Sequence, residues 1–79
     1  MWPFGRERRR ALELLADVPR GIREEVLLLV HGFSIQAIAG LVKAGLAIVA
    51  TETITMRPGV TIETERIQIT DAGRRVLKE

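Results

Sequence analysis

The sequence predicts an α+β fold in which three helices precede a β-hairpin and a short final helix. The spacing of apolar residues is helical up to Ala44 and changes to a period of two after Leu46. The segment 57–60 has proline and glycine at the positions that a type II turn requires, so the chain should reverse there. Thr70, followed by Asp71, has the features of a helix N-cap.

The chain of 79 residues is expected to form one domain, 1–79, with an irregular N-terminal tail, 1–5. A chain of this length buries only about 60–65% of the surface that it exposes when unfolded, so its core is marginal and oligomerisation is a common remedy. Aromatic residues make up 4%, and aliphatic side chains must therefore fill the core. The absence of cysteine excludes disulfides and thiolate metal sites and favours a cytoplasmic setting.

Neither a signal peptide nor a membrane span is expected. The basic segment 6–10 resembles a leader, but Glu13 and Asp17 interrupt the apolar stretch that must follow it. The longest apolar region, 37–50, contains Lys43 and is too short to cross a bilayer. The net charge of +2 gives nucleic-acid binding little support by itself.

The first helix is predicted over Arg6 to Ala16, and Pro19 ends it. Its apolar stripe consists of Ala11, Leu12, Leu15 and Val18, and its charged face of Arg6, Arg10, Glu13 and Asp17. Trp2 and Phe4 in the tail either cover the core or anchor a contact with a dimer partner or another protein.

A second helix is predicted over Ile22 to His31, with acidic residues in its first turn. Its segment 26–30 is apolar on nearly every side, so it should be central to the domain or partly an interface. Gly32 should end this helix in the left-handed conformation.

The third helix is predicted over Ile35 to Ala44, with Ser34 as its N-cap and Gly45 at its end. The side chains expected to face the core are those of Ile35, Ile38, Leu41 and Val42.

The hairpin is predicted as strand and turn over 51–60 and a return strand over 61–69. In the return strand, Ile62 has one parity whereas Ile67 and Ile69 have the other. This switch indicates either a bulge or a tip whose two faces both meet water.

The spacing around Gly32 is typical of a helix-turn-helix unit. Apolar residues occupy the offsets that hold two helices at a steep crossing angle, namely Leu27, Phe33, Ile38 and Leu41. Because a hairpin and a capped helix follow, the sequence predicts a winged helix-turn-helix with three helices, a two-stranded wing and a short C-terminal helix.

The segments 41–47 and 69–74 resemble winged-helix transcription regulators of the multiple-antibiotic-resistance type, and the resemblance covers 22–79. It implies DNA binding, with helix 35–44 in the major groove and the wing tip 57–60 at a phosphate or in the minor groove. That family dimerises through long terminal helices, which this chain lacks. A homodimer would therefore have to use the first helix, the second helix or the Trp2/Phe4 tail.

The outward residues of the third helix are expected to meet DNA. Gln36 could read an adenine edge, and Lys43 and Arg57 could each meet a phosphate. The arginines near the N-terminus form the strongest basic cluster, although spacing also pairs Glu7 with Arg10 and Arg9 with Glu13. The full predicted DNA-binding set is Ser34, Gln36, Ala37, Gly40, Lys43, Arg57, Arg6, Arg9 and Arg10.

The alternative is a protein-interaction module that keeps the fold and has no affinity for DNA. The small residues Ala37 and Gly40 suit close packing against another protein, the helix offers one cation, and the wing carries acidic side chains. An enzyme is not expected, because His31 and Ser34 lack an orienting acid and are better explained as residues at helix ends. Neither a metal nor another cofactor is expected.

Overall fold

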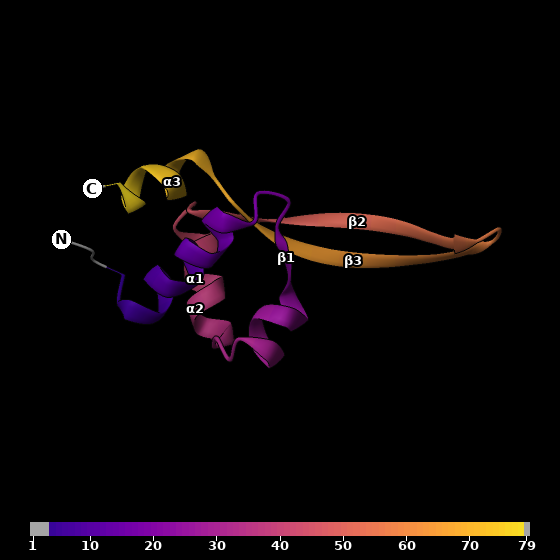
Figure 1. The fold of residues 1–79 in the computed structure, drawn as a ribbon, viewed down its shortest axis with the longest axis horizontal. Coiled ribbons are helices and arrows are strands. Elements are labelled where there is room, and N and C mark those ends of the chain that lie inside the picture. Colours follow the sequence, from indigo (N-terminus) through magenta and orange to yellow (C-terminus); the bar gives the residue numbers. More distant parts are fainter. Residues whose placement is uncertain (1–3, 79) are drawn as a thin grey trace.

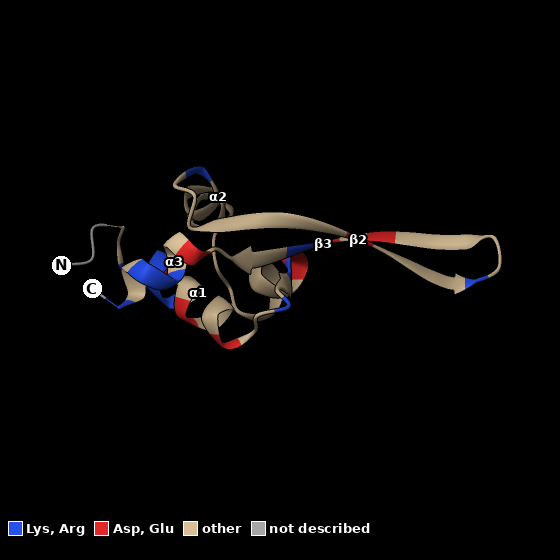
Figure 2. Cartoon of the chain, turned by 90° about the horizontal axis from the view of Figure 1, so that it is seen from above, with Lys and Arg blue, Asp and Glu red and all other residues tan. Residues whose placement is uncertain are grey.

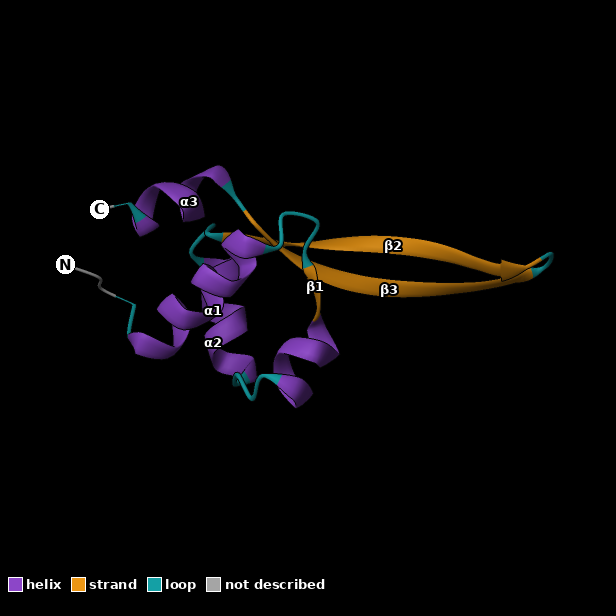
Figure 3. Cartoon of the chain, viewed as in Figure 1, coloured by secondary structure: helices purple, strands orange, loops and turns teal. Residues whose placement is uncertain are grey.

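The computed structural model describes residues 4–78, so Trp2 of the predicted tail lies outside the described residues. Helices gather at one end of the chain, and a long β-hairpin projects from them (Figure 1). The elements are α1 (Arg6–Asp17), β1 (Ile22–Arg23), η1 (Val26–Val30), α2 (Ile35–Lys43), β2 (Ala47–Arg57), β3 (Val60–Ile69) and α3 (Asp71–Leu77). This mixture of helices and an antiparallel sheet confirms the predicted α+β class (Figure 3).

The core lies where α1 and α2 meet the base of the sheet. Its buried side chains are Ala11, Leu12, Leu15, Ile22, Leu27, Phe33, Ile38, Leu41, Leu46, Ala47 and Ile67. The set includes all the apolar positions predicted around Gly32, whose backbone φ of 73° is the expected left-handed one. Phe4 packs against this core from the tail, as expected if the tail covers it.

The predicted start of the second helix was wrong, because Ile22 and Arg23 form the short strand β1. Ile22 lies opposite Ile67 of β3 in an antiparallel pair. The sheet therefore has three strands in the order β1-β3-β2, instead of the two predicted. A strand of two residues is too short to show an apolar period, which is why the sequence pattern did not indicate it.

The close approach of β1 to β3 depends on Gly21. A Cβ atom at this position would lie 2.6 Å from Cγ of Gln68 and 2.9 Å from the carbonyl oxygen of Ile67. Side chains of β3 then hold the preceding loop. Arg66 Nη1 donates to the carbonyl of Gly21 at 3.2 Å, and Gln68 Nε2 donates to the carbonyl of Arg20 at 3.0 Å.

The rest of the predicted second helix forms a short, widened helical turn, η1. The N–H of His31 donates to the carbonyl of Val26 at 3.1 Å, five residues back, where an α-helix would use the carbonyl four residues back. Leu27 is fully buried, but Leu29 and Val30 are 83% and 72% exposed. The segment is therefore not wholly central, and an interface at its exposed residues stays a prediction.

The hairpin of β2 and β3, which we call the arm, begins at Ala47, earlier than predicted. Its register is continuous from the Ala47–Ile69 pair to the Thr55–Thr61 pair, and the register shift lies after Thr55, at Met56. The change of parity in the return strand is therefore not a bulge. It reflects an arm whose outer part meets water on both faces, as the second alternative proposed.

Thr70 begins α3 and ties it to the end of α2. Its Oγ1 accepts from the N–H of Gly73 at 3.1 Å and donates to the carbonyl of Gly45 at 2.7 Å. Its own N–H donates to the carbonyl of Leu46 at 3.1 Å. The predicted N-cap is confirmed. Gly73 is buried, because a Cβ atom there would collide with the backbone oxygen of Leu46.

The substitution Gly73→Ala should therefore destabilise the fold, although alanine favours helices. The obstructing atom belongs to the backbone and cannot rotate away, so we expect a loss of about 1–3 kcal/mol, which is typical of overpacking. Chemical denaturation measures this loss. Arg75→Ala, at an exposed position of the same helix, should change stability by less than about 0.5 kcal/mol. Equal effects of the two substitutions would contradict the close contact.

Candidate functional site

The helix α2 has one buried stripe and two exposed ones, and the prediction placed several of its residues wrongly. Ile38 and Leu41 face the core as expected. Ala37, expected to face outward, is only 4% exposed, whereas Ile35, expected in the core, is 65% exposed. The small side chain of Ala37 is thus buried and the larger one of Ile35 faces solvent.

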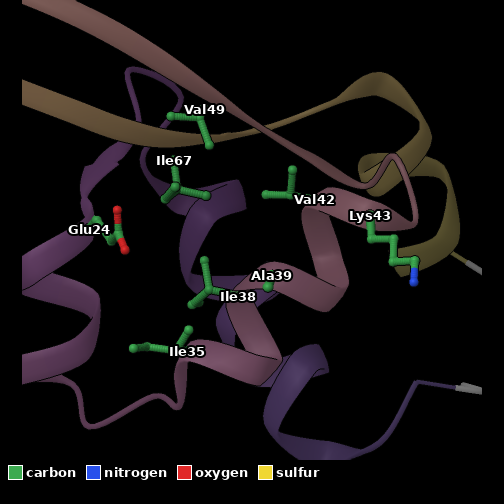
Figure 4. Close-up of a pocket in the computed structure, with 8 residues that line it drawn as sticks. All are labelled: Glu24, Ile35, Ile38, Ala39, Val42, Lys43, Val49 and Ile67. Atoms are coloured by element: carbon green, nitrogen blue, oxygen red, sulfur yellow. The ribbon is translucent and has the colours of Figure 1, made fainter.

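The first exposed stripe is apolar and borders a groove. Ile35, Ala39 and Val42 follow one another along α2 at helical spacing, and Val49 of β2 faces them across the opening (Figure 4). The groove has a volume of about 440 Å³, and Ile38 and Ile67 complete its apolar lining. We call this feature the apolar groove.

Two charged side chains border the apolar groove. Glu24 lies at the side of the strand β1, and Lys43 lies at the other side, at the C-terminal end of α2 (Figure 4). The groove is therefore apolar along its length and carries opposite charges at its two borders.

The second exposed stripe is polar and consists of Gln36, Gly40 and Lys43, at positions i, i+4 and i+7 of α2. The guanidinium group of Arg8 from α1 lies over Gly40, in the space that a Cβ atom would occupy. Gly40, predicted to face outward, is therefore half-buried beneath Arg8. Arg8 takes its place, so we define the polar stripe as Gln36, Arg8 and Lys43. Sequence reasoning missed Arg8 because this contact joins two helices far apart in the chain.

The N-terminal end of α2 is occupied by a carboxylate from α1. Glu7 Oε2 accepts from the backbone N–H of Ser34 at 2.8 Å, and Glu7 Oε1 accepts from Ser34 Oγ at 3.0 Å. Ser34 Oγ also accepts from the N–H of Ala37 at 3.1 Å, which confirms the predicted cap. The hydroxyl is thus used within the fold, and Glu7 bonds to Ser34 instead of the predicted partner Arg10. His31 stacks against Phe33, with ring centroids 6.2 Å apart.

The remaining predicted cations do not gather at α2. Arg6 and Arg10 are exposed on the side of α1 opposite its buried residues, and Arg9 Nε lies 4.0 Å from Glu13 Oε2, the pair expected from spacing. Arg57 is exposed at the far tip of the arm, away from all of them (Figure 2). The nine predicted DNA-binding residues therefore lie on separate surfaces: Gln36 and Lys43 share the second stripe of α2, Arg6 and Arg10 share the exposed side of α1, and Arg57 lies at the arm tip.

Other charges near the site stabilise the fold. Arg66 Nε donates to Glu52 Oε2 at 2.9 Å across the arm, so one of the acidic side chains of the arm is paired. Beside β1, the backbone N–H of Glu25 and then the neighbouring Arg23 hold the pKa of the Glu25 carboxyl below its ordinary value. The Arg23–Glu25 ion pair is exposed, and the shift follows from the backbone bond together with this pair.

Comparison with protein families, with curated proteins and with solved structures found no match for this chain. Across residues 4–78, no helix combines the length and the apolar character that crossing a bilayer requires. The same part of the chain contains no group of three or more histidine or acidic side chains placed to hold a metal ion.

The bonds between Glu7 and Ser34 should link α1 to α2 energetically. Ser34→Ala removes the N-cap and leaves the Glu7 carboxylate without its hydroxyl donor, so we expect a loss of about 1–2 kcal/mol in unfolding free energy. A double-mutant cycle with Glu7→Ala should give a coupling of at least about 0.5 kcal/mol. Glu13→Ala, on the exposed face of the same helix, is the control. Additive effects of Ser34→Ala and Glu7→Ala would contradict the link.

Proposed function

We propose that this chain is a small winged-helix DNA-binding protein that contacts duplex DNA through the polar stripe of α2. Two features support the fold assignment: the order of helices and strands, and the turn at Gly32 between η1 and α2. The single observation that carries the function is the alignment of Gln36, Arg8 and Lys43 on one exposed side of the helix that follows this turn.

Each member of the polar stripe has a chemical part in this proposal. The amide of Gln36 can donate to and accept from the major-groove edge of an adenine. Arg8 and Lys43 supply cations for phosphates on either side of the major groove of the DNA. Because the Glu7 carboxylate occupies the start of α2, the contact uses the middle and C-terminal turns of the helix and not its N-terminus.

The small number of cations sets the expected strength. If two or three phosphates are neutralised, the logarithm of the binding constant should fall with the logarithm of the salt concentration with a slope of about −2 to −3. The proposal therefore predicts weak binding that is lost at moderate salt, unless two copies of the protein bind together.

A protein-interaction module is the second candidate function, and the apolar stripe of α2 favours it. Ile35 is 65% exposed and lies next to the polar stripe on the same helix. A helix that only reads DNA has no need for this apolar side.

A titration of ¹⁵N-labelled protein with duplex DNA at low and moderate salt tests the proposed function. We expect chemical-shift changes at Gln36, Gly40 and Lys43 that fade as salt rises. Lys43→Gln should weaken binding, whereas Lys78→Gln, which removes the same charge from the C-terminal end of the chain, should leave it nearly unchanged. The absence of shifts at low salt, or equal effects of the two substitutions, would exclude the proposal.

Gly40→Ala separates the role of Arg8 from the stability of the fold. The obstructing atoms are the end of a flexible side chain, so Arg8 can swing away, and replacing a glycine inside a helix by alanine should raise stability by up to about 1 kcal/mol. DNA binding should nevertheless weaken, because the cation leaves the polar stripe. Thermal denaturation and the same titration check both effects. Unchanged binding would remove Arg8 from the proposal.

A further inference from the structure

We infer that the chain forms a two-fold homodimer in which the tip of each arm docks in the apolar groove of the other copy. This inference goes beyond the proposed DNA contact and does not depend on it. The first observation is that, within residues 4–78, no third strand pairs with the outer part of the arm. β1 pairs with β3 only at its base, opposite Ile67 and Arg66. An isolated two-stranded hairpin is only marginally stable in water.

The outer part of the arm also has one apolar face. Ile54 lies directly opposite Ile62, and Val60 shares the face of Ile62 because side chains alternate along a strand. Met56 follows Ile54 at the bulge. These four residues, the arm tip patch, are each at least 36% exposed. The other face carries threonine and glutamate, at the pairs Thr53–Glu63 and Thr51–Glu65.

The chain therefore contains a protruding apolar tip and a recessed apolar groove, at the two ends of the same pair of strands. The tip cannot reach its own groove, because the arm extends straight away from the helices (Figure 1). From Val49 at the groove to Ile54 in the tip patch the strand spans about 17 Å. Two antiparallel arms would bring each tip to the base of the other arm, and a two-fold axis gives both copies the same contacts.

The exposed area fits a second copy of the chain. The molecule exposes 5484 Å² and has a radius of gyration of 13.5 Å. A compact monomer of its mass, 8.8 kDa, would expose about 4,800 Å² and have a radius of gyration of about 12 Å. The excess reflects the projecting arm, which offers surface for an interface; one of standard size buries roughly 800 Å² of each partner.

The charges at the two surfaces are also complementary. Glu24 and Lys43 border the apolar groove at opposite sides. The arm tip patch has Arg57 at one end, whereas Glu63 lies on the opposite, polar face. A docked tip can thus bring Arg57 to Glu24 at one border of the groove. The polar stripe, on the neighbouring side of α2, stays open for DNA in this arrangement.

Disulfide crosslinking tests the inference directly, since the chain has no cysteine of its own. Light scattering of the natural chain should first give twice the mass of the chain. An equimolar mixture of Ala39→Cys and Ile62→Cys proteins should then form a mixed disulfide under mild oxidation. Ala39 lines the groove and Ile62 belongs to the tip patch, and both are exposed enough for the variants to fold.

The matched control is a mixture of Ala39→Cys with Thr61→Cys, which places the thiol on the polar face next to Ile62. It should give little or no mixed disulfide. A monomer at concentrations near 100 μM, equal crosslinking of the two mixtures, or disulfides only between two Ile62→Cys copies would each overturn the inference. None of these outcomes bears on the DNA titration, so the two proposals fail independently.

Discussion

The base of β3 is the part of the structure on which the rest depends. Ile67 is paired with Ile22 on one side and Val49 on the other, and only 1% of its surface is exposed. It therefore joins the core, the short strand β1 and the arm at one residue. The direction of the arm and the floor of the apolar groove both follow from this position, because Ile67 also lines the groove.

The parts of the fold that the sequence predicted correctly depend on local chemistry. The caps at Ser34 and Thr70 each bond a backbone N–H three residues further along, and such a bond needs only the hydroxyl and the helix itself. The glycines at the ends of η1 and α2 likewise act within a single turn. Features of this kind can be identified without knowing what else packs nearby.

The errors come from contacts between distant segments. In α2 every position except Gln36 and Lys43 is apolar or small, so the apolar pattern does not decide which side of the helix is buried. The buried side is the one that carries Ala37, Ile38 and Leu41, and Gly40, which has no side chain, leaves room for α1 to approach. Arg8 then covers Gly40. A sequence rule that ranks hydrophobicity alone places Ile35 inside and Ala37 outside, and the structure has the reverse.

The acidic residues of the arm have a physical explanation that does not require DNA. β2 is an edge strand along its whole length, and β3 becomes an edge beyond β1, so the arm presents two rows of open backbone groups. Charged side chains on an edge strand oppose pairing with further chains. Glu63 and Glu65 lie on the polar face of the outer arm, opposite threonines. They therefore favour a single way for the arm to associate, through its apolar face, and oppose open-ended strand addition.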